Sequence, residues 1–461
     1  MRTPRHDRQE NYDFPETNTQ PGAEGASSAG VASGHGAAAA ASAERRAPLS
    51  RRAFLGAAGT AAAVGSAGAV LAGCGKDGGI PMPNADGPQD TGDGQELPLV
   101  DAIVDFDGEY QAGIATAVQA HLNMVAFDIK EGLGLKEMKN LLRLWTEDAR
   151  RLTQGKNPLG SLEPEMAQVP ANLTITCGVG ERFFDVIGKA DQRPEWLHDI
   201  PEFSLDQLED RWSHGDIVLQ ICCDDPTMLA FSTRHMIRSG HNFLDTRWVQ
   251  QGFLNADGAL ERGRTPRNLF GQLDGTVNPR TPEERMEQVW IEDGPQWSHK
   301  GTCMVVRRIA MNLDTWEILD RESRELSMGR TLDTGAPLTG EHEFDDPDFE
   351  ATDKYGLPII DPASHVARSH PPKDKPHERL QRRAYNYDLP PEPGSNLMSN
   401  AGLVFICFQK NPDRQFTPIQ TRLNEQDRLN QWITHIGSSV FFILPGTGGE
   451  DGYWGQGLLE A

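Results

Sequence analysis

Cysteine is scarce in this sequence, and its six cysteines include no C-x-x-C pair. The missing C-x-x-C-H motif excludes the ordinary covalent attachment of haem, and the spacing argues against a disulfide framework or a thiolate metal site. Basic side chains are also outnumbered, since 44 Lys and Arg stand against 67 Asp and Glu and give a net charge of −23. Nucleic-acid binding needs a basic face, so this balance argues against that class of partner.

The first hundred residues have few large apolar side chains. They are rich in Ala, Gly, Ser and Pro and cannot build a core. Within them, Ser50-Arg51-Arg52-Ala53-Phe54-Leu55 precedes a weakly apolar run that ends at Gly73, which is the layout of a bacterial twin-arginine export signal. The alanines and glycines of that run make it a poor stable membrane anchor. We therefore expect residues 1–74 to be an export signal with a disordered N-terminal extension, and residues 75–99 to be a disordered linker.

A second targeting pattern, Leu71-Ala72-Gly73-Cys74, resembles a lipobox. A lipid on Cys74 would anchor the mature protein without a transmembrane helix. Lipid-anchored and freely secreted forms both stay open. In either case we expect export by a bacterium through the twin-arginine machinery, a location outside the cell or in the cell envelope, and membrane contact only through a lipid on Cys74.

Five cysteines remain after Cys74, and most of them lie in apolar, strand-like stretches, as small core residues do. One disulfide bridge among them stays open. They are Cys177, Cys222, Cys223, Cys303 and Cys407.

Short apolar segments alternate with helical patterns along the rest of the chain. The strand candidates are rich in Val, Ile and Phe and are bounded by turn residues. They are residues 122–129, 172–177, 216–223, 303–309, 402–409 and 438–444. The helix candidates, in which apolar residues recur at intervals of three and four, are residues 135–152, 226–239 and 424–435. This mixture predicts an α+β fold.

The order of these segments is similar in the two halves of the folded part. A strand, a helix and two further strands occur in residues 100–290 and again, less clearly, in residues 291–461, and each half closes with a strand after a helix. We therefore expect two α+β domains of similar plan, although no residue-level repeat links them. Residues 331–360 and 368–375 have the composition of surface loops.

The stretch NLFGQLDGTVNPR, from Asn268 to Arg280, contains the dipeptide Asp274-Gly275 between apolar residues. On local sequence alone, this dipeptide is typical of a hairpin turn. No Gly-Lys-Ser/Thr follows, so the stretch is not a phosphate loop. A catalytic carboxylate at Asp274 is the competing interpretation.

A second region decides between these interpretations. Here Ser364-His365-Val366-Ala367-Arg368-Ser369-His370-Pro371 is followed by Leu380-Gln381-Arg382-Arg383-Ala384-Tyr385-Asn386-Tyr387. With Gly271-Gln272-Leu273-Asp274-Gly275, which fits a G-x-x-D-G motif, the sequence resembles the dye-decolourising peroxidases. The resemblance continues through residues 402–409, 415–420 and 437–441 and covers nearly all of residues 100–461.

The resemblance implies a pair of ferredoxin-like domains, with antiparallel sheets and helices packed around them. One non-covalent haem b would lie between the sheet and the helices of the C-terminal half. His365 would be the iron ligand, Asp427 would accept a hydrogen bond from its other ring nitrogen, and Arg382 would contact a haem propionate. Gly275, the last residue of the motif, would contact the haem, and Asn278, which extends the motif, would orient the distal water or peroxide.

Two residues would carry the peroxide chemistry. Asp274 would move a proton between the two peroxide oxygens, and Arg383, eighteen residues after His365, would stabilise the charge that develops as the O–O bond breaks. The resemblance implies that hydrogen peroxide is reduced through an oxoferryl intermediate and that small organic donors such as dyes and phenols are oxidised by one-electron steps. Because an ordinary aspartate has a pKa near 3.9, we expect activity to survive at acidic pH.

Two other functions stay open at this point. A haem-binding or haem-handling protein of an iron-acquisition system would carry the same residues, and peroxide-dependent turnover separates it from a peroxidase. A binding protein without a cofactor would show no Soret band. The aromatic residues Tyr385, Tyr387, Trp432 and Trp454 could relay electrons, but aromatic side chains are more often core packing, so no relay is assigned.

Overall fold

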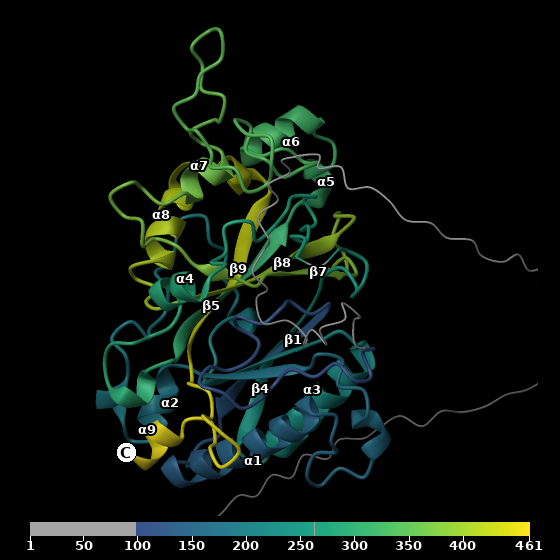
Figure 1. Cartoon of the computed structure of the whole chain (residues 1–461), viewed down its shortest axis with the longest axis vertical. Coiled ribbons are helices and arrows are strands. Elements are labelled where there is room, and N and C mark those ends of the chain that lie inside the picture. Colours follow the sequence, from purple (N-terminus) through teal and green to yellow (C-terminus); the bar gives the residue numbers. More distant parts are fainter. Residues whose placement is uncertain (1–97, 262) are drawn as a thin grey trace, which may run out of the picture. The chain divides into compact units, whose positions relative to one another are not determined.

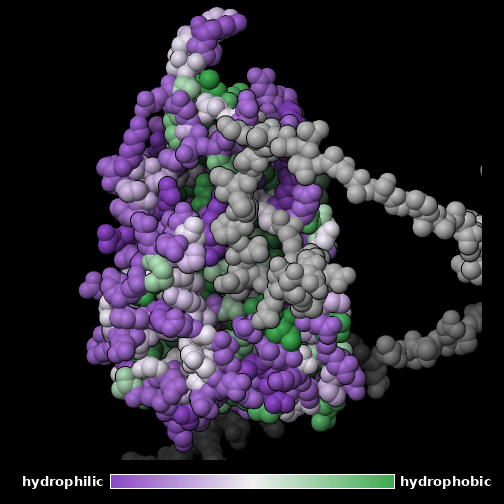
Figure 2. Space-filling view, in the orientation of Figure 1, coloured by the Kyte–Doolittle hydropathy of each residue, from purple (hydrophilic) through white to green (hydrophobic). Residues whose placement is uncertain are grey.

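The computed structural model describes residues 98–261 and 263–461 (Figure 1). The expected export signal, the lipobox and residues 75–97 of the expected linker lie outside the described residues. Among the residues that are described, no helix is both long enough and apolar enough to cross a membrane. Hydrophilic side chains predominate among the described residues on the face seen in Figure 2, in keeping with the net charge of −23.

The N-terminal unit follows the order strand, helix, strand, strand, helix, strand. Its sheet order is β2-β3-β1-β4, and every pairing is antiparallel. This is the ferredoxin-like arrangement. Its elements are β1 (His121–Ile129), α1 (Leu135–Thr153), β2 (Thr174–Val179), β3 (Ile217–Cys223), α3 (Pro226–Gly240) and β4 (Leu244–Phe253).

The C-terminal unit repeats the plan, with the sheet order β7-β8-β5-β9 and antiparallel pairing throughout. A two-residue strand, β6, pairs with β8 just before β7. The elements are β5 (Thr302–Met311), α5 (Leu313–Trp316), α6 (Arg321–Met328), α7 (His365–Ser369), β6 (Gln381–Arg382), β7 (Tyr385–Leu389), β8 (Asn400–Gln409), α8 (Phe416–Gln426) and β9 (Ile433–Ile443).

Short elements complete the described chain. They are η1 (Pro164–Ala167), α2 (Glu181–Val186), η2 (Ala190–Gln192), η3 (Asp210–Trp212), α4 (Pro282–Gln288), η4 (Gln296–Ser298), η5 (Arg428–Gln431) and α9 (Gln456–Glu460). The chain ends on the N-terminal unit, because α9 packs against α1 and Glu460 pairs with Lys139 and Arg143 (Figure 1).

The two sheets join at two narrow seams. Strands β2 and β9 pair through Gly178 with Ile443 and Val179 with Phe442, and β4 meets β7 at Phe253 and Asn386 alone. Together with the pairing of β5 and β8, these seams close the sheet into a barrel-like ring. The expected pair of ferredoxin-like units is confirmed, and the two units share one continuous sheet.

Both faces of the central strands are buried, which explains why they read as continuous apolar runs. In β1, Val125 and Phe127 face the cluster beneath α1 and α3, whereas Met124 and Ala126 face the cluster between the two sheets. A third, smaller cluster packs beside α5 and α6 in the C-terminal unit. The five cysteines after Cys74 are all buried and free, so no bridge forms among them.

The expected helix at residues 424–435 is wrong. Helix α8 ends at Gln426, and β9 begins at Ile433. Asp427 causes the break, because its backbone is extended and its side chain accepts a hydrogen bond from the Leu429 amide at 2.9 Å, capping η5. Strand β4 was not among the sequence candidates, since its alternating exposed and buried residues lack a long apolar run.

Candidate active site

Asp274 lies at the end of a tight turn in the connection between β4 and β5. The turn is closed by hydrogen bonds from the Asp274 amide to the Pro266 carbonyl and from the Asn268 amide to the Gln272 carbonyl, both 2.9 Å. Gly271, with φ +82°, and Gly275, with φ +129°, adopt backbone conformations that favour glycine. The two motif glycines therefore set the path that places the Asp274 side chain.

The Asp274 carboxylate is mostly buried and incompletely paired. Its Oδ2 accepts a hydrogen bond from Asn268 Nδ2 at 3.3 Å. Its Oδ1 is buried without a hydrogen-bond partner among the described residues and lies 3.4 Å from Arg382 Nη2. A buried carboxylate oxygen without a hydrogen bond is costly. This oxygen is therefore available to a group bound at the site.

The structure places Arg382, and not Arg383, beside Asp274. Arg383 is almost fully buried and points the other way, donating to the Thr116 carbonyl at 2.7 Å, to the Ala117 carbonyl at 3.0 Å and to Gln119 Oε1. Arg382 is the last residue of β6, and Arg383 follows it directly. Successive side chains of a strand point to opposite faces. The expectation that Arg383 faces Asp274 is corrected for this reason.

Asn278 forms two hydrogen bonds with the backbone of β6. Its Nδ2 donates to the Arg382 carbonyl at 2.7 Å, and its Oδ1 accepts from the Arg382 amide at 2.9 Å. Both polar ends of the amide are thus engaged by Arg382. The expected role of orienting a water or peroxide does not match this placement, and Asn278 instead holds Arg382 in register with the Asp274 turn.

His365 is the first residue of α7, directly after the buried N-cap Ser364. Its Nδ1 lies 2.6 Å from Asp427 Oδ2, and the Asp427 side chain is 1% exposed. A carboxylate partner fixes the tautomer with the proton on Nδ1 and makes Nε2 a better metal ligand. Nε2 has no hydrogen bond to any described residue. The structure therefore brings His365 and Asp427 together as expected, with one ring nitrogen free for a metal.

Two residues near this site, Arg330 and His435, were missed in the sequence. Arg330 is buried and donates to the Gly335 and Glu343 carbonyls at 2.7 and 2.8 Å, and burial lowers the pKa of its guanidinium. The charge of Arg382 contributes to lowering the pKa of Arg330, and the charge of Arg330 contributes in turn, after burial, to lowering the pKa of His370 at the end of α7. Arg330 therefore adds a second buried guanidinium near Arg382. It stands in a loop without a motif, so no local signal identified it.

His435 lies behind His365. It is buried on β9, with Nδ1 3.7 Å from Asp206 Oδ1, and Asp206 forms a buried ion pair with Arg307. Burial, together with the positive charge of Arg307, lowers the pKa of His435 to about 3. His435 is therefore neutral at physiological pH. Like Arg330, it carries no sequence signature.

Comparisons with known proteins identify the family of this chain. A model described as "Dyp-type peroxidase, N-terminal" matches residues 111–254, and one described as "Dyp-type peroxidase, C-terminal" matches residues 265–448. The chain is 34% identical over 384 residues to a "Dye-decolorizing peroxidase" of Thermobifida fusca (strain YX), covering 79% of this chain and 87% of that protein. This chain belongs to the Dyp-type peroxidase family.

Relatives with other names and with solved structures extend the comparison. A "Deferrochelatase" of Escherichia coli (strain K12) is 34% identical over 373 residues, 77% of this chain and 87% of that protein. The crystal structure of a DyP-type peroxidase from Cellulomonas bogoriensis matches with a TM-score of 0.76 and 44% identity, over 79% of this chain and all of that one. Ferric DtpA from Streptomyces lividans matches with a TM-score of 0.75 and 37% identity over the same shares. As a Dyp-type peroxidase, the protein is a haem-dependent enzyme that holds its haem without covalent bonds.

The residues present fit a haem. His365 offers a free ring nitrogen held by Asp427, and Asp274 offers a buried oxygen without a hydrogen bond. Arg382 has a buried Nε without a hydrogen-bond partner among the described residues, and Arg330 adds a second buried cation nearby. The Arg330 guanidinium is suited to a carboxylate, which is what a haem propionate presents, whereas Arg382 lies beside Asp274.

Proposed function

We propose that this Dyp-type peroxidase reduces hydrogen peroxide with Asp274 and Arg382 and oxidises small organic donors, such as dyes and phenols, by one-electron steps. The observation that carries the proposal is the buried, unbonded Oδ1 of Asp274 facing Arg382 at 3.4 Å. A carboxylate beside a fixed cation combines a proton acceptor with a charge stabiliser.

Each residue of the site has a separate role in this reaction. His365 Nε2 would bind the haem iron, while Asp427 holds the Nδ1 proton and orients the ring. The bound haem supplies an iron that binds peroxide and accepts the electrons of the donors. Asp274 Oδ1 takes a proton from one peroxide oxygen and returns it to the leaving oxygen, which departs as water. The Arg382 guanidinium stabilises the negative charge on that oxygen, and Asn278 keeps Arg382 in place.

Stopped-flow absorbance tests this assignment. We expect haem-loaded protein to lose its ferric Soret absorbance rapidly when it is mixed with hydrogen peroxide. Because Asp274→Asn removes the proton acceptor, it should slow this change by about 10²- to 10⁴-fold with haem still bound. Asp346→Asn, in the exposed acidic loop, is the matched control and should react like the unmodified protein. An unmodified, haem-loaded protein that does not respond to peroxide would refute the assignment.

A second candidate function rests on the similarity to proteins named Deferrochelatase. The protein would then bind or process haem for iron acquisition, with the same His365 ligand. Incubation of the haem-loaded protein with an iron chelator, without peroxide, separates the two functions. Iron release that Asp274→Asn leaves unchanged supports haem handling, whereas stable haem together with peroxide-dependent turnover supports the peroxidase.

We further propose a domain boundary near residues 290 and 291. We also propose, as the first of two points on location, that the protein is exported by the twin-arginine route; the second point is that Cys74 is either lipidated or absent from a secreted form. The Arg51-Arg52 pair and the Leu71–Cys74 pattern support these two points. Arg51→Lys with Arg52→Lys should leave the protein in the cytoplasm of a producing bacterium. Cys74→Ser should release a membrane-bound form into the soluble envelope fraction only if Cys74 is lipidated.

A further inference from the structure

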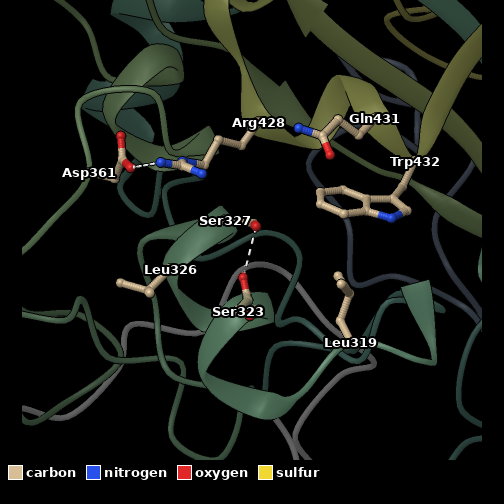
Figure 3. Close-up of a pocket in the computed structure, with 8 residues that line it drawn as sticks. All are labelled: Leu319, Ser323, Leu326, Ser327, Asp361, Arg428, Gln431 and Trp432. Carbon is tan, nitrogen blue, oxygen red and sulfur yellow. Dashed lines mark hydrogen bonds and ion pairs between the residues drawn. The ribbon is translucent and has the colours of Figure 1, made fainter. Parts of the chain in front are cut away.

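Two cavities in the described part of the chain differ in their relation to Asp274. The first, of about 270 Å³, lies beside α6 and η5, and its Arg428 is already paired with Asp361 (Figure 3). The second, of about 510 Å³, is lined by Leu273, which directly precedes Asp274. Of these two cavities, the second therefore reaches the turn that carries Asp274.

Glu343 lines this second cavity and is partly buried. Its Oε1 accepts a hydrogen bond from Thr265 Oγ1 at 2.5 Å and another from Thr276 Oγ1 at 2.9 Å. Hydrogen bonds to a carboxylate are shorter and stronger than those between neutral groups. One carboxylate oxygen thus joins two residues that stand on opposite sides of Asp274 in the sequence.

The two hydroxyl groups lie on the two sides of the turn that carries Asp274. Thr265 directly precedes Pro266, whose carbonyl accepts a hydrogen bond from the Asp274 amide at 2.9 Å. Thr276 directly follows Gly275, whose φ of +129° redirects the chain after Asp274. Joining the two sides of a loop removes conformational freedom from the residues between them. The bridging carboxylate therefore restrains the backbone on which the Asp274 side chain depends.

The segment that carries Glu343 is also fixed to its surroundings. Arg330 Nη1 donates to the Glu343 carbonyl at 2.8 Å. The guanidinium of Arg280 lies 3.7 Å from the ring centroid of Phe344, and its Nη2 donates to the Thr276 carbonyl at 3.2 Å. Arg280 thus connects the same two segments that the Glu343 carboxylate connects. The carboxylate is therefore held in place from its own backbone and from the residue that follows it.

We propose that Glu343 is a positioning residue that sets the placement of Asp274 relative to Arg382. Asp274 Oδ1 lies 3.4 Å from Arg382 Nη2 and has no hydrogen-bond partner among the described residues, so the turn itself must fix this separation. A misplacement of about 1 Å in an active site can slow a reaction by about 10²-fold. The proposal rests on the proton-transfer role proposed above for Asp274 and adds the residue that fixes its geometry.

Stopped-flow absorbance with hydrogen peroxide tests the effect on the reaction. Glu343→Ala removes the shared acceptor and should slow the loss of the ferric Soret band of haem-loaded protein by at least about tenfold. Glu343→Gln keeps a side-chain oxygen as acceptor and should retain the rate to within about threefold. Glu341→Ala, at an exposed residue that lines the same cavity, is the matched control and should react like the unmodified protein. Equal rates in Glu343→Ala and Glu341→Ala would overturn the proposal.

A double-mutant cycle separates positioning from a general loss of structure. If Glu343 acts through Asp274, adding Glu343→Ala to Asp274→Asn should slow the reaction no further, because the proton acceptor is already absent. A further loss of about tenfold would show that Glu343 acts elsewhere and would overturn the proposal. An unchanged rate in Asp274→Asn contradicts the proton-transfer role as well. A slow Asp274→Asn together with a fast Glu343→Ala contradicts the positioning role alone, so the two failures are distinguishable.

Hydrogen exchange followed by mass spectrometry tests the restraint without any reaction. In haem-loaded Glu343→Ala, the amides of residues 265–276 should exchange about tenfold faster, because the hydrogen bonds that close the turn open more often. The amides of β1 should keep their exchange rates. Thr276→Val should reproduce the faster exchange, whereas Thr276→Ser keeps the hydroxyl and should not. The threonine variants decide the matter if Glu343→Ala does not fold, and unchanged exchange in Thr276→Val would overturn the proposal.

Discussion

The two ferredoxin-like units have the same strand order but cover the outer faces of their sheets differently. In the N-terminal unit, the nineteen-residue α1 and the fifteen-residue α3 lie on the sheet (Figure 1), and α1 buries Met138, Leu141, Leu142 and Trp145. In the C-terminal unit, helices α5 to α8 have 4, 8, 5 and 11 residues, and a long insert separates α6 from α7. The same topology thus supports a packed core in one unit and a polar site in the other.

This difference shows that the fold alone does not define the active site. Asp274 and Asn278 lie in the connection between the units, and Arg382 lies in the two-residue strand β6. His365 and Asp427 lie at the ends of short helices. Short helices and long connections leave positions that an apolar helix would otherwise cover.

The largest expected contrast is between the neighbours Arg382 and Arg383. Arg383→Ala removes a buried guanidinium that donates hydrogen bonds to three oxygens. We expect it to lower the free energy of unfolding by about 3–5 kcal/mol. Arg382→Ala should instead slow the peroxide reaction by about 10²- to 10³-fold, with little loss of stability. Urea denaturation and stopped-flow absorbance measure the two effects. The opposite pattern would show that Arg383 serves the site.

The proximal pair gives the next largest effect. Asp427→Asn weakens the hydrogen bond to His365 Nδ1 and should lower the affinity for haem iron by about 10- to 100-fold. The N-terminal unit offers a control, because Asp148 holds the buried His235 at 2.9 Å in a similar pair. Asp148→Asn should change the unfolding midpoint without changing haem affinity. Haem titration followed at the Soret band would contradict the assignment if Asp427→Asn bound haem like the unmodified protein.

The buried His435 predicts a pH dependence of stability in the C-terminal unit. Its pKa is lowered from 6.5 to about 3 in the folded protein, so between these values the unfolded chain binds more protons. This residue should therefore cost about 1.4 kcal/mol of stability for each pH unit of acidification below 6.5. Urea denaturation between neutral and acidic pH should show a shallower slope in His435→Gln. His241→Gln, at an exposed histidine, should keep the original slope.

The smallest effect compares one glycine of the N-terminal unit with one glycine of the active-site turn. Gly132, between β1 and α1, has φ +78°, and Gly271 of the active-site turn has φ +82°, with no close neighbour to block a Cβ in either case. Alanine at either position should cost about 1–2 kcal/mol of stability, because both backbones are left-handed. Only Gly271→Ala should also slow the peroxide reaction, since it shifts Asp274. Equal peroxide rates in the two variants would show that the turn tolerates the change.

The sequence by itself determined the fold class and the two similar units, because periodicity is a local property of the chain. Its motifs indicated the family, and the pairing of His365 with Asp427 was what that resemblance implied. It placed most strands and both long helices within a few residues. It failed at residues 424–435, where apolar spacing predicted a helix and the capping side chain of Asp427 ends one instead.

Only the tertiary structure decided which of two adjacent arginines faces Asp274. Strand alternation guarantees that Arg382 and Arg383 point to opposite sides, but which side is which depends on the pairing of β6 with β8, a contact between residues about 25 positions apart. The same holds for Arg330 and His435, whose burial and charge environment come from segments distant in the chain. Sequence spacing cannot report these relations, because burial and electrostatics depend on distances in space.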